Sequence, residues 1–393
     1  MSKIVKGLAL SAIASSVVMA GAYKIPEQSL NSMALGAAYV AHTTGADAAY
    51  FNPANMAFMG EKQYVEGAIT LAHLPSNVFS LGAASGKSEV EDILIPNFHY
   101  VSAPMGDFRW GVSMTAPGGL TKRWETIFQK AFAEEFSLTI VELNPSASYQ
   151  VMENLSVGVG LRFIYSEGVV KNDARGIGIP LVVDMEADTV EFGYNLALAY
   201  KPTNDINMAV TYRSEIEIEE EGTASINGHT MDAGVTVPLP AALNVAVSKT
   251  WNNTFTLEFN YERTYWSAYE RLEFVGTPLP ITAKNWEDTD TFRIGATIEL
   301  DKITMMMGFA IDETPVPEEK VSFELPDSDA NIFSMGFRYQ QTEALSWGAA
   351  FLYDSKESIS MTPGVSHNPI LAKGGSFTEG GAFLSTIGMA YEF

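Results

Sequence analysis

Cysteine is absent from this chain of 393 residues, and basic residues are scarce, with 24 Lys and Arg against 47 Asp and Glu. Without cysteine, a disulfide scaffold, a thiol nucleophile and a cysteine-ligated metal are all excluded. The formal net charge of −23 argues against nucleic-acid binding, because phosphates are neutralised by Lys and Arg. Charged residues are only 18% and hydrophobic residues 47%, which is too apolar for a disordered chain.

Motifs for catalysis or metal binding are also lacking. The five histidines are scattered and no two of them have metal-ligand spacing. No Gly-x-Ser-x-Gly nucleophile motif occurs. We therefore expect no enzyme, no cofactor and no metal site.

Long hydrophobic runs are missing after residue 20, so no helix is predicted to span a membrane. The first residues differ: Lys3 and Lys6 precede the small apolar run Gly7–Met19, which ends in the small-x-small pattern Val18-Met19-Ala20. This pattern predicts a secretory signal peptide over residues 1–20, with a mature chain from Gly21. The alternative, a membrane anchor, is disfavoured because it needs about 20 apolar residues. An exported chain without cysteine suits the bacterial cell envelope.

Apolar and polar residues alternate along much of the rest. In Leu155–Tyr165 every second residue is Leu, Val, Phe or Tyr, whereas those between are mostly small or polar. Since side chains in a strand alternate with period two, this predicts a strand with one apolar face. The same pattern, strong or weak, gives fourteen candidate strands: residues 65–71, 98–102, 110–114, 141–149, 155–165, 194–200, 208–212, 243–247, 255–261, 292–300, 305–311, 333–339, 347–353 and 383–393.

Two all-β folds fit such alternation, a soluble sandwich and a membrane barrel. The less apolar face is rich in Gly, Ser, Ala, Asn and Thr, and Tyr, Phe and Trp lie near strand ends, as in membrane-interface girdles. Turns such as Glu153-Asn154 are short, while residues 168–187, 215–238 and 355–381 form long connections. These features favour a 14-stranded antiparallel transmembrane β-barrel over residues 61–393, with long extracellular loops.

Residues 21–60 do not alternate and are rich in small side chains such as Gly36-Ala37-Ala38. Fourteen strands enclose a lumen of intermediate width, which must conduct or be plugged. A periplasmic domain is the alternative, but a segment this short would make a poor independent domain. We expect an N-terminal hatch, or plug, inside the lumen.

Several segments, in order along the chain, resemble the outer-membrane long-chain fatty acid transporter family (FadL/TodX, OMPP1-type). They are Tyr23–Ser29, Gly36–Tyr39, Asn52-Pro53-Ala54, Thr211–Glu215, Phe309–Pro317 and Leu325–Asp327. The resemblance implies a 14-stranded barrel with a hatch that includes Tyr23, Ile25, Asn52, Pro53 and Ala54. It also implies passive uptake of hydrophobic molecules, from an extracellular groove to a pocket beside the hatch, and then sideways through a gap at a kinked third strand.

The corresponding stretch for that gap is Ala116-Pro117-Gly118-Gly119. Proline cannot donate to a sheet ladder and glycine in a strand marks a bend or bulge, so this is a reasonable place for a strand to break. An ordinary loop start remains the alternative reading. The next residues, 121–136, are predicted to be helical, with Trp124, Ile127, Phe128 and Phe132 on one apolar stripe. That stripe could form a wall of the capture groove or a lid packed on neighbouring loops.

Inward-facing charges leave two readings open. Basic residues could bind a fatty-acid carboxylate, with Arg162, Lys171, Arg175 and Lys284 as candidates. They could instead form ion pairs that brace the barrel. Neutral aromatic or aliphatic hydrocarbons remain possible substrates, and a structural or adhesive barrel or a polar-solute porin remains the other function class. Expected partners are a hydrophobic small molecule (fatty acid or hydrocarbon) and outer-membrane lipid or lipopolysaccharide, with no nucleic acid, for a chain expected to be monomeric.

Overall fold

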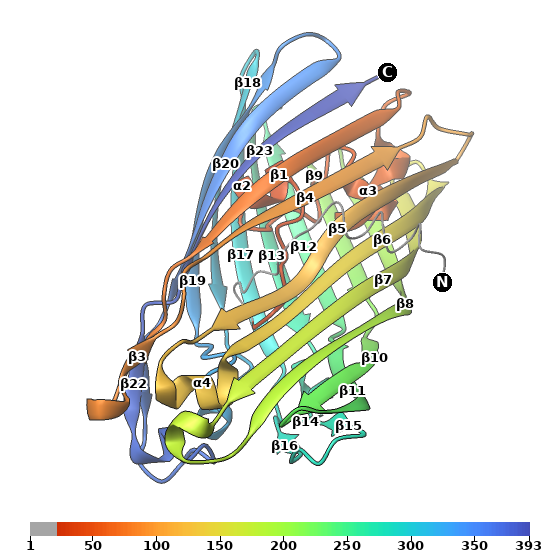
Figure 1. The fold of residues 1–393 in the computed structure, drawn as a ribbon. Coiled ribbons are helices and arrows are strands. Elements are labelled where there is room, and N and C mark those ends of the chain that lie inside the picture. Colours follow the sequence, from red (N-terminus) through yellow and green to blue (C-terminus); the bar gives the residue numbers. More distant parts are fainter. Residues whose placement is uncertain (1–21) are drawn as a thin grey trace.

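The computed structural model describes residues 22–393, which form a closed antiparallel β-barrel (Figure 1). Fourteen strands make the wall, and the ring closes because β1 pairs with β4 on one side and with β23 on the other. The expected signal peptide, residues 1–20, lies outside the described residues.

Each of the fourteen predicted segments corresponds to one wall strand. No predicted segment extends more than one residue past the end of its strand. They are β1 (Tyr64–Leu74), β4 (Glu91–Val101), β5 (Phe108–Arg123), β6 (Glu135–Met152), β7 (Leu155–Asp173), β8 (Val182–Thr203), β9 (Ile206–Arg213), β12 (Ala242–Trp251), β13 (Phe255–Thr264), β17 (Thr289–Glu299), β18 (Ile303–Asp312), β19 (Ala330–Gln340), β20 (Leu345–Lys356) and β23 (Ala382–Glu392). The predicted fold is confirmed.

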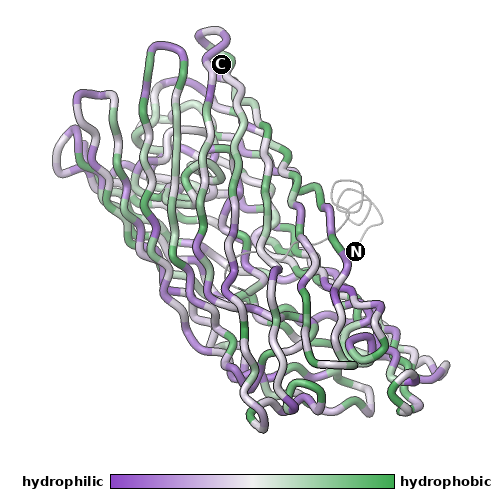
Figure 2. The backbone as a smooth tube through the Cα atoms, turned by 90° about the vertical axis from the view of Figure 1, so that its left-hand side faces the viewer, coloured by the Kyte–Doolittle hydropathy of each residue, from purple (hydrophilic) through white to green (hydrophobic). Residues whose placement is uncertain are grey.

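The side chains of the wall explain why it forms a membrane barrel. Large apolar residues such as Leu161, Phe192 and Phe333 point outward and are exposed, while polar residues such as Asn195 and Thr211 face the lumen and are buried. Figure 2 shows hydrophobic and hydrophilic residues following one another along the strands. An apolar exterior around a polar interior is the pattern of outer-membrane barrels. Among residues 22–393, no helix has the length and hydropathy needed to cross a membrane.

Much of the chain predicted as loops is ordered strand. The segment 215–238 is largely a hairpin, β10 (Ile216–Ile226) and β11 (His229–Leu239), and β10 also pairs with β8. In β10, Ile and Glu residues alternate, which is typical of a strand. The many acidic residues make the segment resemble a solvent-exposed loop in the sequence. Smaller strands and 3-10 helices complete these connections: β2 (Val78–Ser80), β3 (Gly86–Lys87), β14 (Arg271–Leu272), β15 (Phe274–Val275), β16 (Thr282–Ala283), β21 (Ile359–Met361), β22 (Gly375–Thr378), η2 (Gly82–Ala84), η3 (Arg175–Ile177), η4 (Trp266–Ala268), η5 (Glu318–Lys320) and η6 (Leu371–Lys373).

The helix predicted over residues 121–136 is wrong in its length. Only α4 (Ile127–Ala133) is helical, because β5 continues to Arg123 and β6 begins at Glu135. Thr121 pairs with Ser137 and Arg123 with Glu135, so the flanking backbone groups are in the sheet ladder and not in a helix.

The N-terminal residues 22–59 are almost all buried, within the ring of strands. They include α2 (Leu30–Ala34), α3 (Ala48–Phe51) and η1 (Pro53–Phe58), of which α2 and α3 are visible behind β1 and β4 in Figure 1. Helix α2 contacts β18, β19, β20 and β23, whereas η1 contacts β5 to β8. We call residues 22–59 the hatch segment; that it acts as a hatch stays a prediction.

Candidate functional site

Strand β5 parts from β4 halfway along the wall. The two strands pair only from Phe98–Met114 to Val101–Gly111, although β4 extends back to Glu91 and β5 forward to Arg123. The register of β5 with its other neighbour, β6, shifts between Thr115 and Gly118. The residues predicted to break the strand therefore stay inside β5, as a bulge, and no loop begins there. We call the unpaired stretch between β4 and β5 the seam.

The hatch segment covers the edge that β5 exposes at the seam. Ile25 N donates to Pro117 O at 2.9 Å, and Gly119 N donates to Tyr23 O at 2.8 Å. A Cβ atom on Gly118 would lie 3.0 Å from Tyr23 O, so this close approach of two backbones favours glycine. The predicted hatch residues Tyr23 and Ile25 thus meet the predicted lateral opening directly.

Gln28 completes this cover with its side chain. Its Nε2 donates to Ala116 O and its Oε1 accepts from Ala116 N, both at 2.8 Å, as a neighbouring strand would do. Where the pairing with β4 stops, Asn97 Oδ1 and Thr115 Oγ1 are buried without a hydrogen-bond partner in the part of the chain described here. Buried polar atoms are normally satisfied, so the seam is a polar interruption in an otherwise complete wall.

The Asn52-Pro53-Ala54 motif fastens the hatch segment to itself and to the wall. Asn52 Oδ1 accepts from Ala54 N at 3.1 Å, and Asn52 Nδ2 donates to Val40 O at 2.9 Å. Ser156 Oγ on β7 donates to Ala54 O at 2.6 Å. A Cβ atom on Gly158 would lie 2.5 Å from Ala54 N, so the motif lies directly against the strand.

Replacing Asn52 with alanine is expected to loosen the hatch segment without preventing barrel assembly. Two hydrogen bonds of a fully buried side chain are lost, at about 1–3 kcal/mol. Faster amide hydrogen exchange over residues 38–56, with unchanged exchange in the wall strands, would show this. The exposed Asn253→Ala change is the control, and equal exchange in both variants would contradict the prediction.

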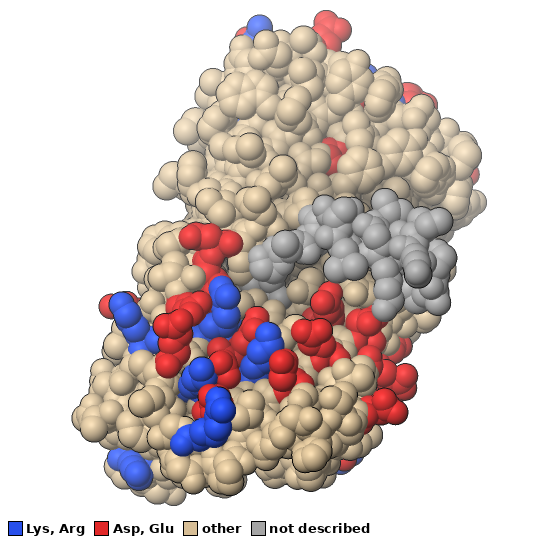
Figure 3. All heavy atoms as spheres, in the orientation of Figure 1, with Lys and Arg blue, Asp and Glu red and all other residues tan. Residues whose placement is uncertain are grey.

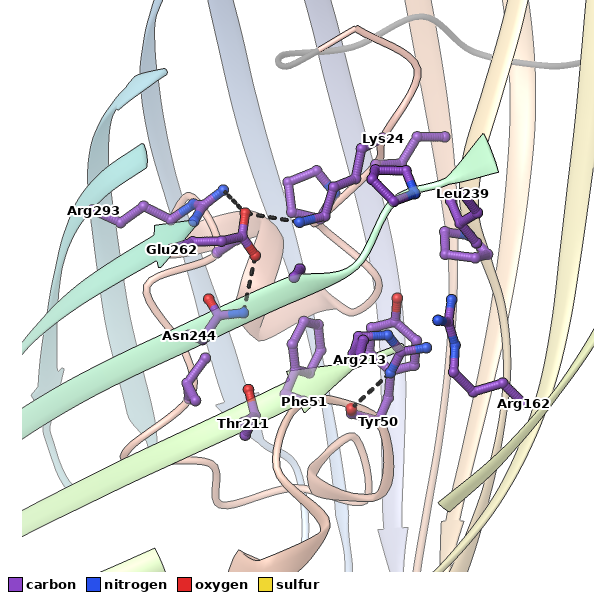
Figure 4. A pocket seen from close by; sticks show the side chains of 17 residues that line it. Lys24, Tyr50, Phe51, Arg162, Thr211, Arg213, Leu239, Asn244, Glu262 and Arg293 are labelled. Atoms are coloured by element: carbon purple, nitrogen blue, oxygen red, sulfur yellow. Dashed lines mark hydrogen bonds and ion pairs between the residues drawn. The ribbon is translucent and has the colours of Figure 1, made fainter. Parts of the chain in front are cut away.

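A cavity of about 60 Å³ lies beside the seam, between the hatch segment and the wall (Figure 4). Pro117 of the bulge lines it, and so do four basic side chains: Lys24, Arg162, Arg213 and Arg293. Tyr50 and Phe51 add an aromatic side. We call it the upper cavity.

Two carboxylates hold these cations. Glu262 lies 2.9 Å from Lys24 Nζ and 3.1 Å from Arg293 Nη2, and it also accepts from Asn244. Glu142 lies 3.0 Å from Arg162 Nη2 and also pairs with Arg213. Each cluster therefore joins two basic side chains to one carboxylate. Glu27 and Asp312 also lie near Arg293, but among the residues that line the cavity four are basic and only Glu262 is acidic.

Of the four predicted carboxylate partners, only Arg162 reaches this cavity. Lys171 pairs with Glu135 at 3.0 Å, and Arg175 pairs with Asp173 at 2.8 Å. Lys171 lies near the end of β7, and Arg175 begins η3, which follows that strand. Figure 3 shows Lys and Arg side chains interleaved with Asp and Glu on the part of the surface that is low in the view. Lys284 pairs with Glu324 at 2.6 Å beside a different, much smaller void. Lys24, Arg213 and Arg293 were missed as site residues, although the period-two alternation does place Arg213 and Arg293 inward.

Aromatic side chains fill the end of the barrel with the long connections, which is lowermost in Figure 1. Tyr23 packs on Trp266 and Trp286 with ring centroids 4.8 and 5.8 Å apart, and its hydroxyl donates to Pro238 O. Trp124 is fully buried and donates from Nε1 to Phe323 O at 2.8 Å.

The residues predicted to line a capture groove are mostly packed against buried neighbours. Phe128 and Phe132 pack on the same buried cluster as Trp124, so this part of the stripe lies in a lid. Ile127 is the exception and is 58% exposed. The helix is too short to present all four residues on one free face, because Trp124 precedes it.

Comparison with known proteins agrees with this architecture. Residues 11–393 match the family model "Outer membrane protein transport protein (OMPP1/FadL/TodX)". A "Long-chain fatty acid transport protein" of Escherichia coli O6:H1 is 25% identical over 70% of this chain and 72% of its own length. Outer membrane protein P1 of Haemophilus influenzae is 24% identical over 87% of each chain.

Among solved structures, a Pseudomonas aeruginosa FadL homologue superposes with a TM-score of 0.78 at 18% identity, covering 94% of this chain and 99% of its own. The Pseudomonas putida toluene transporter TodX superposes with a TM-score of 0.73 at 15% identity, covering 96% and 100%. At these identities the solved structures support the fold alone. The family membership rests on the family model, which covers nearly the whole chain. The chain therefore belongs to the outer membrane protein transport protein (OMPP1/FadL/TodX) family, as a transport barrel of the bacterial outer membrane and not an enzyme.

Proposed function

We propose that this barrel takes up hydrophobic molecules passively across the outer membrane and releases them sideways through the seam between β4 and β5. The molecule enters at the end with the long connections, passes the aromatic cluster, reaches the upper cavity and leaves into the membrane. In this proposal residues 1–20 are the signal peptide, residues 21–60 the hatch, and residues 61–393 the barrel. The single observation that carries the proposal is the seam itself, where a wall strand loses its partner beside a cavity.

A sideways exit suits an apolar molecule. The lipopolysaccharide leaflet resists such molecules, whereas the membrane interior accepts them, so the route runs downhill without an energy source. In a closed barrel every wall strand pairs on both sides, and unpaired edges are costly in lipid. The hatch segment satisfies β5 at the seam through Tyr23, Ile25 and Gln28, so moving that segment would uncover the opening.

The charges favour an acidic amphiphile over a neutral hydrocarbon. Four basic residues and one acidic residue, Glu262, line the upper cavity, which leaves positive charge for a substrate carboxylate. A long-chain fatty acid has this chemistry, and several relatives are named long-chain fatty acid transport proteins. A neutral aromatic substrate, as for the toluene transporter TodX, is the alternative. An open porin is not favoured, because the hatch segment and the aromatic cluster fill the lumen.

Mass spectrometry of small molecules extracted from the purified, detergent-solubilised protein tests the substrate class. An unrelated barrel is the control, and we expect fatty acids to be enriched. Arg213→Gln should reduce this enrichment, because it removes the excess charge and leaves Glu142 paired with Arg162. The exposed Lys249→Gln should not. Neutral hydrocarbons in place of fatty acids would overturn the carboxylate part, and no enrichment at all would count against the transport of hydrophobic molecules.

A further inference from the structure

A second cavity lies on the other side of the hatch segment, toward the end of the barrel with the short turns, which is uppermost in Figure 1. Its volume is about 160 Å³. His42, Thr43 and Asn55 line it from the hatch segment, and Lys201 and Asn207 from the wall. No Asp or Glu is among its lining residues as described, which is unusual in a chain of net charge −23. We call it the lower cavity.

One short piece of chain lies between the two cavities. Val40 lines the upper cavity, while the next two residues, Ala41 and His42, line the lower one. We call Val40–His42 the partition. Val40 and Ala41 pack on Ala209 of β9 and Ala246 of β12, and these four small apolar residues form a separate cluster.

A single carboxylate holds the partition against the wall. Glu258 of β13 accepts hydrogen bonds from the backbone N–H groups of Val40, Ala41 and His42, at 2.5, 2.8 and 2.9 Å. Successive N–H groups that converge on one anion form a strong, charge-assisted contact. Glu258 is 4% exposed, so its carboxylate depends on these three donors rather than on water.

Along strands β9 and β12, the lumen-facing residues on either side of Ala209 and Ala246 are polar. On β9, Asn207 and Thr211 flank Ala209, and on β12, Asn244 and Ser248 flank Ala246, all pointing into the lumen. Asn260 of β13 lies between Glu258 and Glu262 on the same face. It is fully buried, and neither its Oδ1 nor its Nδ2 has a hydrogen-bond partner among the described residues.

We propose that the partition is the gate of an axial aqueous passage joining the two cavities, and that Glu258 is the positioning residue that keeps it shut. With the partition displaced, polar side chains line the route from one cavity to the other, interrupted only by Ala209 and Ala246. Once Glu258 is replaced, the passage selects small anions, because basic residues outnumber acids in the lining of the upper cavity and the lining of the lower cavity contains Lys201 but no Asp or Glu. This function is separate from the sideways release of hydrophobic molecules.

Conductance in a planar lipid bilayer tests the gate, with chloride in a potassium chloride gradient as the probe. The wild-type barrel should be almost silent. Glu258→Ala should open at least about tenfold more often, since three hydrogen bonds to a charged group are lost together. The reversal potential should report anion selectivity. Glu258→Gln should fall between the two, because an amide oxygen still accepts. Glu299→Ala, an exposed carboxylate near the end of β17, should behave as wild type.

A reversible cross-link checks that the current uses this route. The chain has no cysteine, so Ala41→Cys with Ala209→Cys adds the only pair, in the Glu258→Ala background. Oxidation should silence the current and reduction should restore it. The proposal is overturned if a correctly folded Glu258→Ala barrel conducts no more than wild type, or if its current is cation-selective, or if the cross-link leaves it unchanged. Uptake of hydrophobic molecules by Glu258→Ala should be measured in parallel. That uptake tests release through the seam, and the conductance tests the gate.

Discussion

Gly118→Glu is expected to abolish uptake of hydrophobic molecules while the barrel still assembles. The new side chain begins 3.0 Å from Tyr23 O and 3.2 Å from the Ile140 side chain, so it must fill the space where the hatch segment meets the bulge, beside the upper cavity. Burying a carboxylate without a partner is unfavourable, so the new group would stay charged and hydrated. Its charge and water would then oppose the passage of an apolar molecule. We expect uptake of a radiolabelled long-chain fatty acid by whole cells to fall at least about tenfold, since several kcal/mol oppose the passage.

Gly118→Ala is the matched control for this test. It adds only the Cβ atom at the same place, so it should retain most of the uptake. Surface labelling must show equal amounts of both variants in the outer membrane. Normal uptake by a normally assembled Gly118→Glu barrel would rule out release through the seam. A disulfide between Asn97→Cys and Thr115→Cys, where the pairing of β4 with β5 would continue, should close the seam reversibly.

Glu142→Gln is expected to cause the largest loss of stability. Glu142 is fully buried and holds both Arg162 and Arg213, so its loss leaves two guanidinium groups together in the lumen without a counter-charge. Removing one partner of a buried ion pair costs about 3–5 kcal/mol. Urea unfolding of the detergent-solubilised barrel, followed by tryptophan fluorescence, measures the change in the free energy of unfolding.

Two further variants test whether the loss of stability comes from the burial of the ion pair or from the loss of any ion pair. Glu392→Gln breaks the exposed pair with Lys62 and should cost less than about 1 kcal/mol. Arg213→Gln should cost less than Glu142→Gln, because Glu142 keeps Arg162. If Glu142→Gln were no more destabilising than Glu392→Gln, the cluster would not brace the barrel.

The strands could be read from the sequence because their pattern is local. In β7, Val157, Val159 and Leu161 meet lipid and the glycines between them face the lumen, so a period of two is enough. The same rule underlies β10 and β11, but there Glu217, Glu219 and Glu221 alternate with a buried face, and their charge suggested a solvated loop. The helix over residues 121–136 was predicted too long because its first residues alternate equally well as a strand paired with β6.

The site was less predictable, because its contacts join residues far apart in the chain. The bulge in β5 follows from Pro117, Gly118 and Gly119, whose lack of a donor and of side chains is a local property. Gln28 carries no signal of its role, since its amide replaces a missing strand only where the hatch segment passes the seam. Lys171 and Arg175 looked equivalent to Arg162, yet they lie at the end of β7 and in η3, where they pair with partly exposed acids and do not reach the cavity.

By itself, the sequence determined that this chain forms an acidic, cysteine-free membrane barrel, how many strands make its wall and which face of each strand meets lipid. These features depend on composition and on the two-residue period of a strand, which hold at every position along the chain. The tertiary structure alone decided which inward charges share a partner, where the ring of hydrogen bonds is interrupted and which residues of the hatch segment lie there. Those depend on how the sheet closes around residues 22–59, and closure brings together side chains that are more than two hundred positions apart.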